Sequence, residues 1–336
     1  MVIATKKQRF HIIIFTFLTL INFSFSDNDD YFSIIILPDT QYYTSRFPDF
    51  IYHQMDWIVQ NRDLLNIQYV VHMGDITDNN KESAWEVASS SYKILEEAGI
   101  PYSVVCGDND IKNPQKNSYD GKRHTELFNK YFPVSRFDKP GSWWKGGFFD
   151  LGKIDNYYCL FRYRDYRYMI LNLEIAPRSP VLKWASTICS GNSTEKVFVV
   201  THDYIDSQGK RLDDLKTFEL HGKDANGKPK GNNADEVFNK LIKKNPNILM
   251  VLCGHKNGTY EKTVKIPLDS GKTRKVFEIL SDFQDEKMKG SDERSGKGLL
   301  RVLKIYPVRN EFVLSTVSVL TGKTKDDEIY LSMGNN

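Results

Sequence analysis

Residues 69–78 read YVVHMGDITD, an apolar run that stops at a glycine and two acidic residues. Residues 69–73 have the length and the β-branched side chains of a buried strand, and the Gly74-Asp75 pair that follows is typical of a turn. Four other segments repeat this arrangement. They are FSIIILPDTQ at 32–41, YSVVCGDND at 102–110, FVVTHD at 198–203 and ILMVLCGHKN at 248–257.

The order of apolar and amphipathic segments predicts an α/β fold. Strand-like runs at 32–37, 69–73, 102–106, 168–173, 197–200 and 248–253 are joined by segments that include helical patterns at 50–61 and 84–97. Continuous apolar strands between helices indicate a sheet that is covered on both faces. The runs at 276–281, 299–306 and 311–319 have no helical pattern between them, which predicts antiparallel pairing. We therefore expect one domain with a mixed sheet system, in which the polar stretches 111–147 and 203–233 form long loops.

The five strand ends place potential metal ligands and acid–base groups at one edge of such a sheet. In open α/β sheets, ligands bind at the carboxyl ends of the strands. Carboxylate oxygens and imidazole nitrogens suit Mn, Fe or Zn ions rather than a thiolate centre. A single aspartate after a strand is commonly a turn or cap residue, but five such ends in succession favour a metal or phosphate site.

The composition excludes several classes of protein. The 336 residues are 40% hydrophobic and 26% charged, values typical of a globular protein rather than of a disordered chain, a fibre or a small disulfide scaffold. Residues 1–26 hold three basic residues and no acidic one, so the rest of the chain has 43 of each, and its bulk charge does not indicate nucleic-acid binding. Arginines and tyrosines alternate around residues 162–168, which fits an exposed hairpin face better than a nucleic-acid surface.

Residues 1–26 have the pattern of a secretory signal peptide rather than of a retained membrane anchor. Three basic residues precede an apolar run at 12–23, which is too short to span a hydrocarbon core of about 30 Å. Small serines at 24 and 26 suit a cleavage site. We expect residues 27–336 to be a secreted domain with no further membrane span.

Cysteines and glycosylation sequons are compatible with this compartment. Cys106, Cys159, Cys189 and Cys253 allow three pairings if all are bonded, and buried free thiols are an equal alternative for two of them, Cys106 and Cys253. Of the three Asn-X-Ser/Thr sequons, at Asn22, Asn192 and Asn257, Asn192 is the better glycan candidate and Asn257 is expected to be unglycosylated. Asn22 would leave with the signal peptide.

The order of the polar motifs resembles the calcineurin-like metallophosphoesterases, and in particular a secreted branch whose first motif reads Asp-Thr-Gln-Tyr-Tyr, as residues 39–43 do here. The resemblance extends from residue 32 to about 284 and includes WIVQN at 57–61, FPVSR at 132–136, Leu173-Glu174 and SDFQ at 281–284. It implies two mixed β-sheets packed face to face and flanked by helices. It also implies a phosphomonoester or phosphodiester substrate.

The resemblance assigns roles to the polar residues at the strand ends. Asp75 is expected to bridge two metal ions and Asp39 to bind the first, with Gln41 and Asn257 as weak amide ligands. His202, His255 and Asp108 are expected to bind the second. In the implied mechanism, a bridging water becomes the nucleophile and the metal ions clamp the phosphoryl oxygens. Asp78 is expected to orient other groups rather than bind metal.

Three positions depart from the family pattern. Asp108-Asn109 stands where the family has Asn-His, and Asn257 stands where it has a second histidine. Asn109 occupies the catalytic position, yet an amide neither donates a proton at neutral pH nor carries charge, and loss of one acid–base group costs about 10²–10⁴ in rate. Two hypotheses result: a secreted metallophosphoesterase with an altered site, and a weakened relative that serves as a binding or effector protein.

Overall fold

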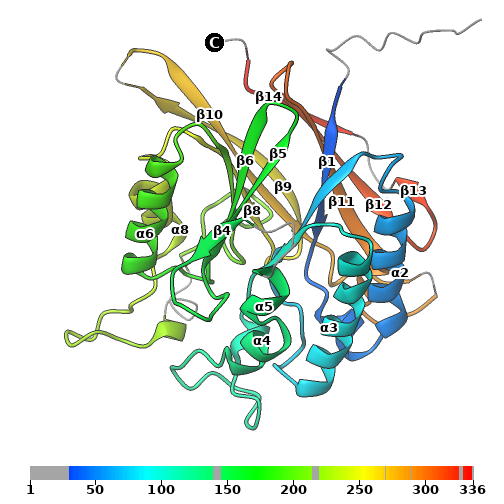
Figure 1. Ribbon diagram of the computed structural model, residues 1–336. Coiled ribbons are helices and arrows are strands. Elements are labelled where there is room, and N and C mark those ends of the chain that lie inside the picture. Colours follow the sequence, from blue (N-terminus) through cyan, green and yellow to red (C-terminus); the bar gives the residue numbers. More distant parts are fainter. Residues whose placement is uncertain are drawn as a thin grey trace, which may run out of the picture.

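Two seven-stranded β-sheets form the centre of the computed structural model, which describes residues 30–334 except 139–144, 214–218, 269, 289 and 325–327. The predicted signal peptide and Asn22 lie outside the described residues. Figure 1 shows the two sheets facing each other, with α2 (Pro48–Gln60) and α3 (Glu82–Glu97) on one outer side and α6 (Ser179–Gly191) and α8 (Ala234–Val237) on the other. The predicted α/β fold with two mixed, helix-flanked sheets is thus confirmed.

The first sheet has the strand order β13-β12-β11-β1-β2-β3, with β14 also paired to β12. Strands β1, β2 and β3 are parallel, and β11 pairs with β1 and β12 in the antiparallel sense. The bounds are β1 Phe32–Leu37, β2 Ile67–His72, β3 Tyr102–Val104, β11 Leu299–Tyr306, β12 Glu311–Ser318, β13 Lys323–Thr324 and β14 Ile329–Ser332. The antiparallel pairing of the C-terminal runs 299–306 and 311–319 is therefore confirmed.

The second sheet has the order β4-β5-β6-β7-β8-β10-β9. Its bounds are β4 Gly146–Phe148, β5 Tyr157–Tyr163, β6 Tyr166–Asn172, β7 Lys196–Val200, β8 Ile248–Cys253, β9 Gly258–Pro267 and β10 Thr273–Asp282. Strands β6, β7, β8 and β10 are parallel to one another. The expectation of antiparallel pairing for the run 276–281 is only half right, since β10 is antiparallel to β9 but parallel to β8.

Both faces of the second sheet are buried, which explains its uninterrupted apolar strands. On β7, Phe198 and Val200 face the first sheet, while Val197 and Val199 pack with residues of α6. Phe198 meets Phe312 of β12 across the core, with ring centroids 6.3 Å apart. Complete burial of each such side chain contributes about 1.5–3 kcal/mol.

The stretch 111–147 is more structured than the sequence indicates. It contains α4 (Glu126–Tyr131) and α5 (Val134–Phe137), so the prediction of one long loop is wrong there. The physical reason is burial, because Phe128, Phe132 and Phe137 are fully covered. Where it is described, the stretch 203–233 has a single 3₁₀ turn, Glu219–His221.

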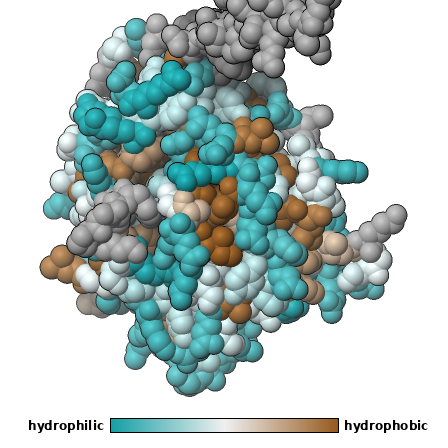
Figure 2. Space-filling model, turned by 45° about the vertical axis from the view of Figure 1, so that its right-hand side comes forward, coloured by the Kyte–Doolittle hydropathy of each residue, from teal (hydrophilic) through white to brown (hydrophobic). Residues whose placement is uncertain are grey.

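The surface and the cysteines agree with an ordinary packed core. On the face drawn in Figure 2, hydrophilic side chains surround smaller apolar areas. All four cysteines are buried, and none of them forms a disulfide bond. Among the described helices, none has the length and apolar character needed to span a membrane.

Candidate metal centre

The carboxyl ends of β1, β2, β7 and β8 and the turn after β3 bring five predicted ligands together. Ligand atoms of Asp39, Asp75 and His202 lie within 4.8 Å of one another, and so do those of Asp108, His202 and His255. His202 belongs to both groups, so the two sets of potential ligands are adjacent. The clustering of these side chains agrees with the sequence, and their roles as ligands stay predictions.

The backbone around the two groups is held in special conformations. Asp75 and His255 have φ angles of 52° and 72°, in the left-handed region that side chains rarely adopt. Two glycines permit the close approach of strand ends: a Cβ at Gly107 would lie 2.1 Å from Asp75 Oδ1, and one at Gly254 would lie 2.1 Å from Asp39 Oδ1. The turn glycines are therefore required by the geometry of the acidic residues they face.

Asp39 is almost completely buried in the first group. Burial raises the pKa of Asp39 well above its usual range, and the nearby charge of Asp282 adds to the shift. The backbone N–H of His255 donates to Asp39 Oδ2 at 3.1 Å. A carboxylate in this position has too little compensating charge from the protein and favours a bound cation.

His202 is oriented by a hydrogen bond from its second ring nitrogen. Nδ1 donates to the carbonyl oxygen of Met73 at 2.8 Å, which directs Nε2 towards Asp108 Oδ1 at 3.3 Å and Asp75 Oδ1 at 3.4 Å. Burial alone lowers the pKa of His202, but the charges of Asp75 and Asp39 outweigh it and hold the pKa well above its ordinary value. This arrangement is typical of a histidine that binds a metal through Nε2, with the metal in place of the proton.

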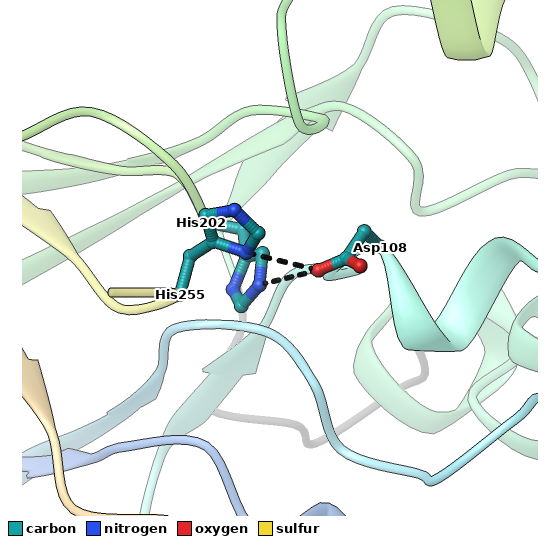
Figure 3. A group of neighbouring side chains, drawn as sticks. All are labelled: Asp108, His202 and His255. Atoms are coloured by element: carbon teal, nitrogen blue, oxygen red, sulfur yellow. Dashed lines mark hydrogen bonds and ion pairs between the residues drawn. The ribbon is translucent and has the colours of Figure 1, made fainter. Parts of the chain in front are cut away.

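Asp108 is the acceptor shared by both histidines. Figure 3 shows His202 and His255 pointing at the same carboxylate, and His255 Nδ1 lies 3.0 Å from Asp108 Oδ1. Burial raises the pKa of Asp108, but hydrogen bonds from His202 and His255 override it and hold the pKa well below its ordinary value. The other oxygen, Oδ2, accepts a hydrogen bond from the hydroxyl of Tyr119.

Asn109 supports Asp75 instead of offering a proton. Its backbone N–H donates to Asp75 Oδ1 at 2.9 Å, and its side-chain Nδ2 donates to Asp75 Oδ2 at 2.6 Å. Its side-chain oxygen accepts a hydrogen bond from Lys112 Nζ. Both ends of the amide are thereby engaged.

A chain of side chains from β10 reaches Gln41. Gln284 Nε2 donates to Asp282 Oδ2 at 2.8 Å, and Gln284 Oε1 accepts a hydrogen bond from Gln41 Nε2. Gln41 Nε2 is also 3.3 Å from Asp75 Oδ2. Gln41 Oε1 is buried and has no hydrogen-bond partner among the described residues.

Sequence reasoning did not assign a role to Asp110, which organises the turn after β2. This carboxylate is fully buried and accepts hydrogen bonds from the backbone N–H groups of Ile76, Thr77 and Gly107 at 2.7–3.0 Å. Burial and the charge of Asp75 raise the pKa of Asp110 to about 7. Its place in the run Gly107-Asp108-Asn109-Asp110 was the only signal that the sequence carried.

Three other predicted positions lie at the margin or in the core. The Asp78 carboxylate is 3.6 Å from Arg46 Nη2, and Asn257 is exposed in the turn before β9. His72 is fully buried in β2, with Nε2 2.9 Å from Thr40 Oγ1, and burial lowers its pKa to about 3. His72 is therefore a neutral packing residue, while the roles of Asp78 and Asn257 stay predictions.

The residues of the centre fit bound metal ions. The orphaned oxygen of Gln41 is a ligand atom with no other partner. Several carboxylates are buried beside it, and the pKa of Asp282 is raised to about 6 by burial, with the charge of Asp75 contributing. Oxygen and nitrogen donors without a thiolate match Mn, Fe or Zn.

Known proteins share the fold and the family pattern. The model of the calcineurin-like phosphoesterase family matches residues 32–257, more than half of the chain. A curated relative, the uncharacterized protein YvnB of Bacillus subtilis, is 29% identical over 292 residues, which is 86% of this chain but 20% of the relative. The chain thus spans about one fifth of the length of that relative.

Solved structures with low sequence identity have the same architecture. A dimetal phosphatase from Danio rerio aligns with 91% of this chain and 100% of its own, with a TM-score of 0.51 and 14% identity. A purple acid phosphatase from yellow lupin (Lupinus luteus) seeds aligns with 91% of this chain and 54% of its own, with a TM-score of 0.51 and 12% identity. At these identities, the likeness shows the fold alone.

Proposed function

Since the chain belongs to the calcineurin-like phosphoesterase family, we propose that it is a secreted, metal-dependent hydrolase of phosphomonoesters or phosphodiesters. The observation that supports this proposal best is the pair of adjacent ligand groups that share His202. A neighbouring pair of cation sites is what hydrolysis with two metal ions requires.

The proposed ligands follow the two groups. Asp39, Asp75 and Gln41 would hold the first metal ion, with Asn257 as a weak or water-mediated ligand. His202, His255 and Asp108 would hold the second, and Asp75 would lie between the two. When bound, metal ions of this kind supply Lewis acidity and lower the pKa of a bound water.

The protein's own groups have separable tasks in this proposal. Asp75 offsets the repulsion between two cations, and Asn109 holds Asp75 through two hydrogen bonds. Tyr119 donates to Asp108 and stays protonated, because burial and the charge of Asp108 raise the pKa of its phenol. Asp78 is proposed to orient the turn after β2 rather than to bind metal.

A second function, a weakened enzyme that acts as a binding or effector protein, is favoured by one specific observation. The Asn109 amide uses Nδ2 on Asp75 and accepts from Lys112. An amide N–H is not acidic at neutral pH, so Asn109 delivers no proton to a leaving oxygen, which is the task that a histidine would perform at this position.

Secretion is part of the proposal. The pattern of residues 1–26 supports a signal peptide, and residues 27–336 would then be the mature domain. Asn192 is half-buried at the end of α6, where its Nδ2 donates to the Ile188 carbonyl oxygen at 2.9 Å. It is the proposed glycan acceptor, since a glycan on Asn257 would stand beside His255.

Metal analysis and a hydrolysis assay test the proposed function. The mature protein would be analysed for Mn, Fe and Zn, then incubated with Mn²⁺ and either 4-nitrophenyl phosphate or bis-(4-nitrophenyl) phosphate. Bound metal with Mn²⁺-dependent hydrolysis, lost in an Asp75→Ala variant that still folds, supports an enzyme. Bound metal without hydrolysis of either ester would instead support the effector hypothesis.

A further inference from the structure

We propose that Lys112 binds a phosphoryl oxygen of the substrate and supplies positive charge that Asn109 cannot. The inference rests on the proposed function, because it assumes a phosphoester at the candidate metal centre. It adds a substrate-binding residue to the proposed site and explains how an anionic ester would be held beside several carboxylates.

The position of Lys112 is fixed by the amide that replaces the family's histidine. Lys112 follows the 3₁₀ turn Asn109–Ile111, and its Nζ donates to Asn109 Oδ1. The other end of that amide donates to Asp75 Oδ2 at 2.6 Å. The ammonium is thus one side chain away from the carboxylate that is proposed to lie between two metal ions.

The charge of Lys112 is not neutralised by its neighbours. Its second hydrogen-bond acceptor is the neutral Asn79 Oδ1, at 3.3 Å, and the Tyr119 ring centroid lies 5.5 Å from Nζ. Within the described part of the chain, no carboxylate forms an ion pair with Lys112. Two of the three ammonium N–H donors are used on amide oxygens, so one donor and the full positive charge remain for a ligand.

The surrounding loop leaves part of Lys112 exposed to solvent. Lys112 is only half-buried, and Tyr119, which bonds to Asp108 and lies near the ammonium, is 45% exposed. Lysine is a common phosphate-binding residue because its compact charge tolerates many angles of approach. An anion at the centre would therefore meet Lys112 from the solvent side, without displacing a buried group.

The alternative is a purely structural role, in which Lys112 only ties Asn79 to Asn109. The variant Lys112→Met separates the two roles, since methionine keeps much of the apolar stem and removes the charge and the donors. Lys112→Arg keeps the charge. Lys116→Met is the matched control, because Lys116 is an exposed lysine of the same loop.

The experiment measures binding of inorganic phosphate to Mn²⁺-loaded protein by calorimetry, with metal content and aryl phosphate hydrolysis determined in parallel. We expect Lys112→Met to weaken phosphate binding by about tenfold to a hundredfold, the usual effect of losing a hydrogen bond to a charged group. Metal content should be unchanged, Lys112→Arg should retain more affinity than Lys112→Met, and Lys116→Met should bind like the wild type.

The outcomes separate this inference from the proposed function. Equal phosphate affinity in Lys112→Met and Lys116→Met would overturn the assignment of Lys112. Loss of metal from Lys112→Met would overturn it as well, because it would show that Lys112 acts on the metal ligands through Asn109 and Asp75. If the wild type binds phosphate through Lys112 but hydrolyses no ester, the hydrolase proposal fails while the assignment of Lys112 stands. If the metal-loaded wild type does not bind phosphate, the assignment of Lys112 is overturned.

Discussion

Replacing Gln284 by leucine should weaken the first metal site and leave the second intact. Gln284 accepts a hydrogen bond from Gln41 and donates to Asp282 at 2.8 Å. Its removal leaves Gln41 Nε2 with only the longer contact to Asp75 Oδ2 at 3.3 Å, so the oxygen proposed as a ligand is held less firmly. The second group, which comprises Asp108, His202 and His255, has no described contact with Gln284.

The size of the effect follows from these contacts. Loss of a residue that orients a ligand costs about tenfold to a hundredfold in metal affinity, equivalent to about 1.4–2.7 kcal/mol. The buried Asp282 also loses one of two hydrogen bonds from Gln284 while keeping the backbone one at 2.9 Å. Losing a partner of a buried polar group costs about 1–3 kcal/mol in the free energy of unfolding.

Calorimetric titration of metal-free protein with Mn²⁺ would measure the affinity of both sites, and elemental analysis would give the amount of metal bound. We expect one site at the wild-type affinity and one weakened. Gln208→Leu, a change at an exposed glutamine, serves as the control. If Gln284→Leu is less stable yet binds both metal ions as the wild type does, Gln284 only stabilises the fold and the reasoning is wrong. Equal weakening of both sites would also contradict it.

Three further changes test the centre. Asp75→Ala should lose most bound metal while circular dichroism shows a retained fold; unchanged metal content would refute the assignment of Asp75. The double change Asp108→Asn with Asn109→His should raise aryl phosphate turnover by about 10²-fold, because it restores a group that can protonate a leaving oxygen. Equal or lower turnover would count against a weakened site. His72→Gln should flatten the pH dependence of stability. The pKa of His72 is lowered to about 3 in the folded protein, so the unfolded chain takes up a proton first as the pH falls below about 6.5. The wild type should therefore lose about 1.4 kcal/mol per pH unit relative to the variant between about pH 6.5 and pH 3, as measured by urea unfolding.

The sequence predicts the buried strands well because their pattern is local. The expected runs 32–37, 248–253 and 299–306 coincide with β1, β8 and β11. By contrast, β9 was not predicted, since its GTYEKTVKIP run is largely polar and only half-covered as an edge strand. What makes it a strand is pairing along its length with β10, a partner that the sequence pattern does not identify.

The residues of the candidate site also differ in how well the sequence predicts them. Asp39, Asp75 and His202 lie within three residues of the ends of their strands, so strand ends were enough to identify them. Gln284 could not be assigned a role, because its contact with Gln41 joins residues 243 positions apart and depends on the register of β10 in the sheet. Lys112 was missed for another reason: its position depends on a turn in a stretch whose fold the polar sequence does not reveal.

The altered positions all make the candidate metal centre less rich in imidazole or more negative. Relative to the family pattern, Asp108 adds a negative charge, and Asn109 and Asn257 remove imidazoles. We therefore expect a donor set that is richer in oxygen and more negative, with a preference for Mn²⁺ over softer ions that bind nitrogen or sulfur. Bound metal ions would offset part of this negative charge, and a cation outside the metal ligands would add to the attraction for an anionic ester. Among the described side chains around Asn109, the ammonium of Lys112 is such a cation, because its hydrogen-bond partners are neutral.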